Sequence, residues 1–250
     1  MYAERASRLD GAVVWTRTMP AAPGPTAAYP VLPDGCMDLL WTGGKLYVAG
    51  PDTRAHAPGE GPGGAGARYD GVRFAPGAGP AFLGVPAHEL RDRRVALADL
   101  WPAARVRALT GRATGAADPA SALEDLVLRH AADTEPPDPV LRAVARRLGA
   151  GSTVAAAADA AGIGARQLHR RSLAAFGYGP KTLARILRLQ RALTLVRGGV
   201  PYADAAVAAG CADQAHLSRE MRDLAGTTLG AYAALANRET PQPSGSSTTA

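Results

Sequence analysis

The sequence has few cysteines and no long apolar run, and each scarcity excludes a class of protein. Its two cysteines, Cys36 and Cys211, are too few and too scattered for a disulfide framework or a zinc site. No apolar run approaches the roughly 20 residues that span a bilayer. The first residues also lack the apolar core of a signal peptide. We therefore expect a cytoplasmic protein without metal, other cofactor or membrane partner.

Acidic residues are missing from a long stretch in the second half of the chain. Between Asp159 and Asp204 there is no Asp or Glu, although eight basic residues occur there. Over 138–238, fourteen Lys and Arg stand against six Asp and Glu, whereas residues 1–137 are close to neutral. A basic half beside a neutral half is typical of a chain that binds phosphate, the alternative being a solvated helix face. The eight are Arg166, Arg170, Arg171, Lys181, Arg185, Arg188, Arg191 and Arg197.

The pattern of apolar residues changes from strand-like to helical along the chain. Its length of 250 residues suits two modest domains, and 47% hydrophobic residues suffice for their cores. Short runs at 12–19, 36–41, 45–49 and 71–74, separated by Gly and Pro, predict strands of a small barrel or sandwich. The stretch 51–66 is rich in Gly and Pro and predicts a mobile loop.

From Val95 onward the pattern predicts helices over 96–109, 121–132 and 140–148. Asp118-Pro119 and Asp138-Pro139 are typical helix starts, with Asp as N-cap and Pro at the first helical position. The fold class is therefore α+β, with a β-rich, barrel-like N-terminal domain and an all-α C-terminal one. We place the domains at 1–134 and 135–238 and predict a disordered tail at 239–250.

A short motif occurs twice in the basic half. Residues 157–162 have the sequence AADAAG and residues 205–210 have AAVAAG. Small residues let two helices cross closely, and Gly adopts the positive φ that a tight turn requires. Each copy precedes a second helical pattern, over 165–176 and 214–224, so each predicts a helix-turn-helix. A helix over 180–196 would join the two units.

The second helix of each unit has an apolar stripe and a polar face. Leu168, Leu173 and Phe176 point inward in the first, and Leu217, Met221 and Leu224 in the second. Arg and Gln can grip guanine and adenine bidentately in the major groove, and other Arg side chains hold phosphates. The candidate DNA-binding residues are Arg166, Gln167, His169, Arg170 and Arg171 in the first unit and Gln214, His216, Ser218, Arg219 and Arg222 in the second.

Residues 140–236 resemble the DNA-binding domain of the AraC/XylS family of bacterial transcription regulators. The segments that carry the resemblance are AADAAG with QLHRR at 167–171, FGYGP at 176–180, RILRLQRA at 185–192, AAVAAG, and DQAHLSREM at 213–221. The resemblance implies seven helices and two recognition helices that enter successive major grooves. It matches Arg166, His169 and Arg170, and then Gln214, His216 and Arg219, to base-side positions.

The sequence departs from the family pattern at several apolar positions. Ser172 stands where an aromatic core residue is usual, and Cys211 and Met221 replace Phe. Leu229 replaces Pro after the second unit. These differences concern packing more than the DNA-binding assignment.

The resemblance also implies an N-terminal domain that binds an effector or dimerises, and residues 10–90 fit a cupin-like barrel. Segments 32–41, 48–51 and 71–77 resemble an uncharacterised domain found in some regulators of this kind. Cys36, Asp38 and Trp41 are the candidate effector contacts. Cys36 could be a reactive thiol if an Arg lowered its pKa, or a small buried residue.

These features favour a non-enzymatic, sequence-specific transcription regulator, either activator or repressor, controlled at its N-terminal domain. Its partners would be double-stranded promoter DNA, a small-molecule effector, RNA polymerase and a second copy of the chain. One alternative is a DNA-repair protein that accepts alkyl groups on Cys36, although no activating His and Glu pattern accompanies it. The other is a non-specific interaction module.

Overall fold

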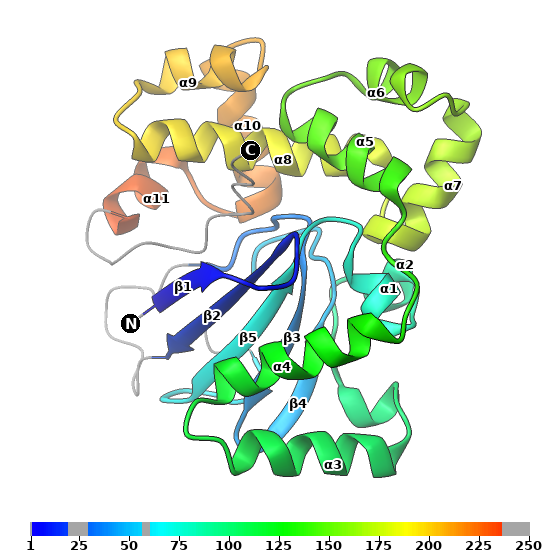
Figure 1. Cartoon of the computed structure of the whole chain (residues 1–250). Helices are drawn as coiled ribbons and strands as arrows, with labels where there is room; N and C mark the ends of the chain where they lie inside the picture. Colours follow the sequence, from blue (N-terminus) through cyan, green and yellow to red (C-terminus); the bar gives the residue numbers. More distant parts are fainter. Residues whose placement is uncertain (1, 20–29, 57–60, 237–250) are drawn as a thin grey trace.

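The computed structural model describes residues 2–19, 30–56 and 61–236. An antiparallel sheet with flanking helices forms the first part, and seven helices, α5 to α11, form the second (Figure 1). This arrangement confirms the α+β class with its β-rich half before its helical half. The predicted tail at 239–250 and part of the predicted loop at 51–66 lie outside the described residues.

The six strands found in the described residues belong to one sheet in the order β1-β2-β5-β3-β4-β6. Every neighbouring pair is antiparallel, and β1 and β6 lie at the two ends of this order, so the described strands form an open sheet. The four predicted strands correspond to β2 to β5. The bounds are β1 Tyr2–Ala6, β2 Ala12–Thr18, β3 Met37–Thr42, β4 Lys45–Ala49, β5 Arg68–Phe74 and β6 Arg94–Ala96.

The two faces of the sheet have different surroundings because side chains alternate along each strand. Leu39, Val48 and Val72 belong to a buried cluster shared with the helices that cover one face. Trp15, Leu40 and Tyr69 form a smaller cluster on the opposite face. The helices of the first part are α1 (Gly79–Leu83), α2 (Ala87–Leu90), η1 (Leu97–Asp99), α3 (Ala103–Thr114) and α4 (Pro119–Ala132).

Both predicted Asp-Pro helix starts are confirmed. The Asp118 carboxylate accepts the Ala120 backbone N–H at the start of α4, and Asp138 accepts those of Val140 and Leu141. The helix expected over 96–109 is wrong at its start. A short 3-10 turn, η1, is followed by Pro102 in an extended conformation, and α3 begins only at the next residue.

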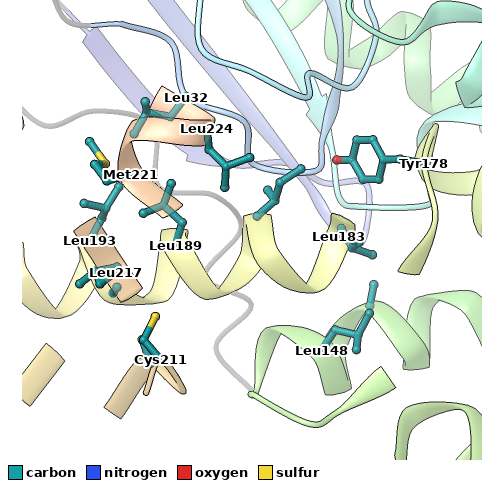
Figure 2. Close-up of a cluster of buried hydrophobic side chains, with 14 of the residues drawn as sticks. Leu32, Leu148, Tyr178, Leu183, Leu189, Leu193, Cys211, Leu217, Met221 and Leu224 are labelled. Carbon is teal, nitrogen blue, oxygen red and sulfur yellow. The ribbon is translucent and has the colours of Figure 1, made fainter. Parts of the chain in front are cut away.

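The seven C-terminal helices surround one core, which Figure 2 shows in part. Leu183, Ile186 and Leu189 of α8 are fully buried in it. Leu32, from the segment before β3, belongs to the same cluster and lies beside Leu224. The bounds are α5 Pro139–Gly149, α6 Val154–Ala160, α7 Ala165–Phe176, α8 Pro180–Arg197, α9 Tyr202–Ala209, α10 Gln214–Ala225 and α11 Leu229–Ala236.

A buried carboxylate fastens the N-terminal segment to α4. The Glu124 side chain is only 2% exposed. It accepts hydrogen bonds from Arg5 Nη2 at 2.8 Å, Ser7 Oγ at 2.8 Å and the Arg8 backbone N–H at 2.6 Å. Burial alone would raise the pKa of Glu124, but these hydrogen bonds outweigh it and lower the pKa to about 2.

We expect this carboxylate to make stability acid-sensitive. The pKa of Glu124 in the unfolded chain is near 4.5, so the stabilisation is complete above that pH and is lost as pH falls toward 2. Chemical denaturation measures the free energy of unfolding at about pH 5 and at about pH 3. Its decrease from the higher to the lower pH should be smaller for Glu124→Gln than for the unmodified chain. Equal losses in the two proteins would contradict this role.

Candidate nucleic-acid interface

The first helix-turn-helix consists of α6 and α7 with α5 as support. Thr153 caps α6 by accepting the Ala156 N–H at 3.1 Å. Ala157 and Ala158 are buried where α6 crosses its neighbours. Gly162 has a φ of 64° in the turn, as the motif predicts, and the Ile163 N–H bonds to the Ala158 carbonyl. The small residues therefore allow the close helix crossing, and the glycine allows the tight turn, as the motif predicts.

Helix α7, the second helix of this unit, presents its polar side chains to solvent. Leu168 and Phe176 are buried as predicted, Leu173 is half-buried, and Ser172 is fully buried. Arg166, Gln167, His169 and Arg170 are exposed. The His169 ring lies close to the Gly179 backbone at the start of α8.

Arg171 is placed differently from the other candidates on α7. It is half-buried, and its guanidinium bonds to the Asp138 carboxylate that caps α5. In this conformation it joins two helices of the first unit. The geometry gives Arg171 a supporting role and leaves the outward positions to the four exposed side chains.

The second helix-turn-helix consists of α9 and α10 and repeats the first. Gly210 has a φ of 87°, and the Cys211 N–H bonds to the Ala206 carbonyl at 2.8 Å. Asp213 caps α10 by accepting the His216 backbone N–H at 2.6 Å. Leu217, Met221 and Leu224 are buried in the positions predicted for them.

Three candidates on α10 are exposed, and two are partly enclosed. Gln214, Arg219 and Arg222 face solvent, whereas Ser218 and His216 are half-buried. His216 Nδ1 accepts the Ala212 backbone N–H at 3.2 Å, and its Nε2 lies 3.5 Å from Glu220 Oε1. His216 thus braces the turn, while the other three are directed outward.

Helix α8 joins the two units, which lie toward its opposite ends (Figure 1). Its 18 residues correspond to about 27 Å at 1.5 Å per residue. Arg191 Nη1 donates to the Gly149 carbonyl at 2.6 Å, and its Nη2 donates to the Ala209 carbonyl. These carbonyls end α5 and α9, so one arginine bonds to both units.

We expect Arg191→Met to destabilise the helical half. The substitution leaves two helix-terminal carbonyls without their charged donor, and hydrogen bonds to charged groups contribute about 1.5–3 kcal/mol each. Arg191 is half-buried, so water compensates for part of this loss. The predicted net loss of unfolding free energy, measured by urea denaturation, is therefore about 2–3 kcal/mol, at the low end of the sum of the two bonds. Arg197→Met is the matched control, because Arg197 is exposed and its Nε bonds only within its own helix turn, to the Leu193 carbonyl. Equal losses for the two variants would contradict the bridging role.

A basic groove lies between the two units, beside α8. Its volume is about 430 Å³, and Ser152, Thr153, Lys181, Arg185 and Arg188 are among its lining residues. Arg185 bonds to Glu220 and Asp223. Lys181 and Arg188 have no ion pair among the residues described here, which leaves their charges available to an anion in the groove.

The N-terminal effector candidates do not form one site. Asp38 and Trp41 are three residues apart on β3, so strand alternation sends them to opposite faces. Asp38 faces a cavity, whereas Trp41 packs in the helix-covered cluster. The expectation that Trp41 shares a site with Asp38 is therefore wrong.

Cys36 is a structural residue of this fold. It is 4% exposed, and burial together with the neighbouring Asp34 raises the pKa of its thiol, against the opposing effect of Arg73. A reactive thiol would need the reverse shift, so the geometry opposes the alkyl-acceptor alternative. The structure contains no cluster of three potential metal ligands within its described ranges.

The cavity of about 100 Å³ on the outer face of the sheet includes Arg73, which the sequence interpretation missed. Arg73 and Trp15 contact Asp38 there, Arg73 through Nε at 3.1 Å and Trp15 through Nε1 at 2.7 Å. Burial raises the pKa of Asp38, although Arg73 opposes that shift. The signal in the sequence was a charged residue inside the apolar run 71–74. The lining also includes Tyr2, Arg17, Met19, Leu40, Ala49, His56, Tyr69 and Arg94.

Comparisons with known families match both parts of the chain. Residues 157–234 match the model of a helix-turn-helix domain of the AraC type. Residues 12–96 match a domain of unknown function (DUF6597). No curated protein sequence matches the chain. No helix within the described ranges is long and apolar enough to cross a membrane.

Among solved structures, ToxT from Vibrio cholerae O395 is similar, with a TM-score of 0.46 and 8% sequence identity. The match covers 91% of this chain and 98% of that one. The apo form of a ToxT variant from Vibrio cholerae gives a TM-score of 0.47 and 9% identity over 92% and 99% of the two chains.

Proposed function

We propose that this chain is a transcription regulator that binds specific double-stranded DNA. An AraC-type helix-turn-helix domain follows a domain of unknown function in its sequence. The observation that carries the proposal is that both second helices expose arginines after a glycine turn, Arg166 and Arg170 on α7 and Arg219 on α10. Two recognition helices joined by one rigid helix suit successive major grooves on one face of DNA, about 34 Å apart.

Each exposed side chain has a distinct part in this proposal. Arg166, Gln167 and Arg170 of α7 approach base edges in one groove, and Gln214 and Arg219 of α10 approach them in the next. The exposed His169 and Arg222 and the half-buried Ser218 belong to the same two helices and add contacts at the margins. Lys181 and Arg188, in the basic groove between the units, hold the intervening phosphates.

The N-terminal half would control DNA binding through its contacts with both units. Arg91 Nη1 donates to the Gly177 carbonyl at the end of α7, and the Ala55 N–H bonds to the Leu224 carbonyl of α10. Gln190 of α8 donates to the Pro33 carbonyl at 2.6 Å. Because the sheet domain contacts both recognition helices and their connection, a shift in it would change their relative orientation.

The proposal extends to the partners expected of such a regulator. A small-molecule effector would act at the N-terminal half, RNA polymerase would be contacted at the promoter, and two copies of the chain would bind as a dimer. The site of action is the cytoplasm, and no catalytic step is assigned.

Selection from a random pool of DNA duplexes tests the DNA-binding proposal, because the pool contains every short operator sequence. The full chain is expected to enrich a motif with two conserved elements about 10 bp apart, one for each recognition helix. A pool that stays random after repeated rounds, with salt-sensitive binding to every duplex, would indicate a non-specific basic surface instead.

A further inference from the structure

The second helices of the two units, α7 and α10, correspond residue by residue when they are compared from their N-caps. Each has 12 residues and ends at a glycine in the left-handed conformation. The N-cap Gly164 follows the turn residue Gly162 by two positions, whereas the N-cap Asp213 follows Gly210 by three. The second turn is therefore one residue longer, and the correspondence along the helices differs from that of the Ala-rich motifs before them.

The burial of the two helices supports this correspondence. Their fourth residues, Leu168 and Leu217, are both fully buried in the helical core. Their sixth residues, Arg170 and Arg219, are both exposed. Equivalent positions counted from the N-caps therefore face the same way in the two units.

The seventh residue of each helix makes an equivalent ion pair with the helix that precedes its unit. Arg171 of α7 bonds to Asp138, the N-cap of α5. Glu220 of α10 accepts from Arg185 Nε of α8 at 2.9 Å. The charges are reversed but the contact is retained, so the correspondence extends to the way in which each second helix is held.

This correspondence makes Ala215 the counterpart of Arg166. Both are the second residue of their helix, and both are exposed. The second and sixth positions are four residues apart and lie on one face of a helix. The first unit therefore presents Arg166 and Arg170 together, whereas the second presents Ala215 and Arg219.

We propose that Ala215 determines specificity by packing its methyl group against the C5-methyl group of a thymine in the major groove. The inference rests on the proposed DNA-binding function and assigns base identities to it. Arginine bonds bidentately to guanine, whereas alanine offers only an apolar contact, and thymine is the base with a methyl group in this groove. The two elements of the operator are therefore unequal, with two guanines for α7 and a guanine and a thymine for α10.

The surroundings of Ala215 favour this reading over a passive surface position. The other exposed residues of α10 are all polar or charged, namely Gln214, Arg219, Arg222 and Asp223. N-terminal residues of a recognition helix are those that contact base edges, and Ala215 is the second residue of its helix. Packing its methyl group against that of thymine removes apolar surface from water and leaves no side-chain hydrogen-bonding group without a partner.

Deoxyuridine, the nucleotide that lacks the methyl group of thymidine, tests this contact directly. The selected duplex is used, and the α10 element is the one in which Arg219→Ala loses discrimination. Deoxyuridine replaces each thymidine of this element in turn. One replacement should weaken binding by the unmodified chain about fourfold, the value expected for one buried methyl-sized group. The same replacement should not weaken binding by Ala215→Gly, which lacks the side-chain methyl group.

Ala215→Arg places in the second unit the residue that the first unit has at this position. It should change the preferred base at that pair from thymine to guanine, by at least about fivefold. Ala208→Arg is the matched control, because it adds the same charge at an exposed position of α9. It should leave the preference for thymine unchanged.

The inference is overturned if no thymine methyl group in the α10 element affects binding, or if both arginine variants prefer the same base. The deoxyuridine measurement on the unmodified chain stands even if Ala215→Arg fails to fold. An enriched motif without sensitivity to the methyl group would refute only the role of Ala215. A pool that yields no motif would refute the DNA-binding function and this inference with it.

Discussion

Replacing Arg166 or Arg219 with alanine is expected to weaken binding to the selected DNA duplex by about 1–3 kcal/mol each, roughly 5- to 150-fold. Both side chains are exposed on recognition helices, at positions where a guanidinium can bond bidentately to guanine. Each variant should also lose discrimination at one base pair of its own element. Because the two positions lie in different units, the losses should be additive in the double variant.

Fluorescence anisotropy with the selected duplex and with point-substituted duplexes measures both effects. Arg188→Ala is the matched comparison, because Arg188 lies in the basic groove and is assigned to phosphate. It should weaken all duplexes about equally and reduce the salt slope by about 1. If Arg166→Ala and Arg219→Ala behave like Arg188→Ala, the assignment of base contacts to α7 and α10 is wrong.

Replacing Phe176 with alanine is expected to lower the free energy of unfolding by about 3–5 kcal/mol. Phe176 ends α7 and is 1% exposed in the helical core. Its ring lies over Gly77 of the sheet domain, where an added Cβ would approach Cε1 to 2.6 Å. The substitution should therefore create a cavity and also loosen the contact between the two halves.

Phe82→Ala separates these two effects. Phe82 is 6% exposed, and its ring stacks on Phe74 inside the sheet-domain cluster, with centroids 5.0 Å apart. Urea denaturation should show a loss of similar size for both variants. Hydrogen exchange should rise at residues 77–90 and in α7 for Phe176→Ala, and around Phe74 for Phe82→Ala. The same pattern of hydrogen exchange in both variants would contradict the role of Phe176 in the contact between the two halves.

Sequence patterns predicted the helical half closely because its helices and turns are specified by residues close together in the sequence. The glycines of the two turns, the Asp caps and the buried stripes of Leu168 and Leu217 are spaced by the geometry of single helices. The four inner strands were predictable for the same reason. The edge strands β1 and β6 were not, because β1 is mostly exposed and carries Glu4 and Arg5, and β6 has three residues.

The candidate sites depended on contacts between residues far apart in sequence, which local patterns do not encode. Arg171 bonds to Asp138, and Arg191 bonds to the carbonyls that end two other helices. Composition alone would include Arg171 and Arg191 among the basic residues that are available to bind DNA. Trp41 is a different case, because its odd spacing from Asp38 on one strand already assigns it to the other face of the sheet.

Binding of the full chain to its selected duplex and to a scrambled duplex, at about 150 mM salt, tests the central claim most directly. Two recognition helices that contact bases should give at least a hundredfold tighter binding to the selected duplex, since specific sites exceed non-specific ones by about 10³–10⁷. Equal affinity for both duplexes, falling in parallel as salt rises, would show that the basic half recognises phosphate alone and would contradict the account.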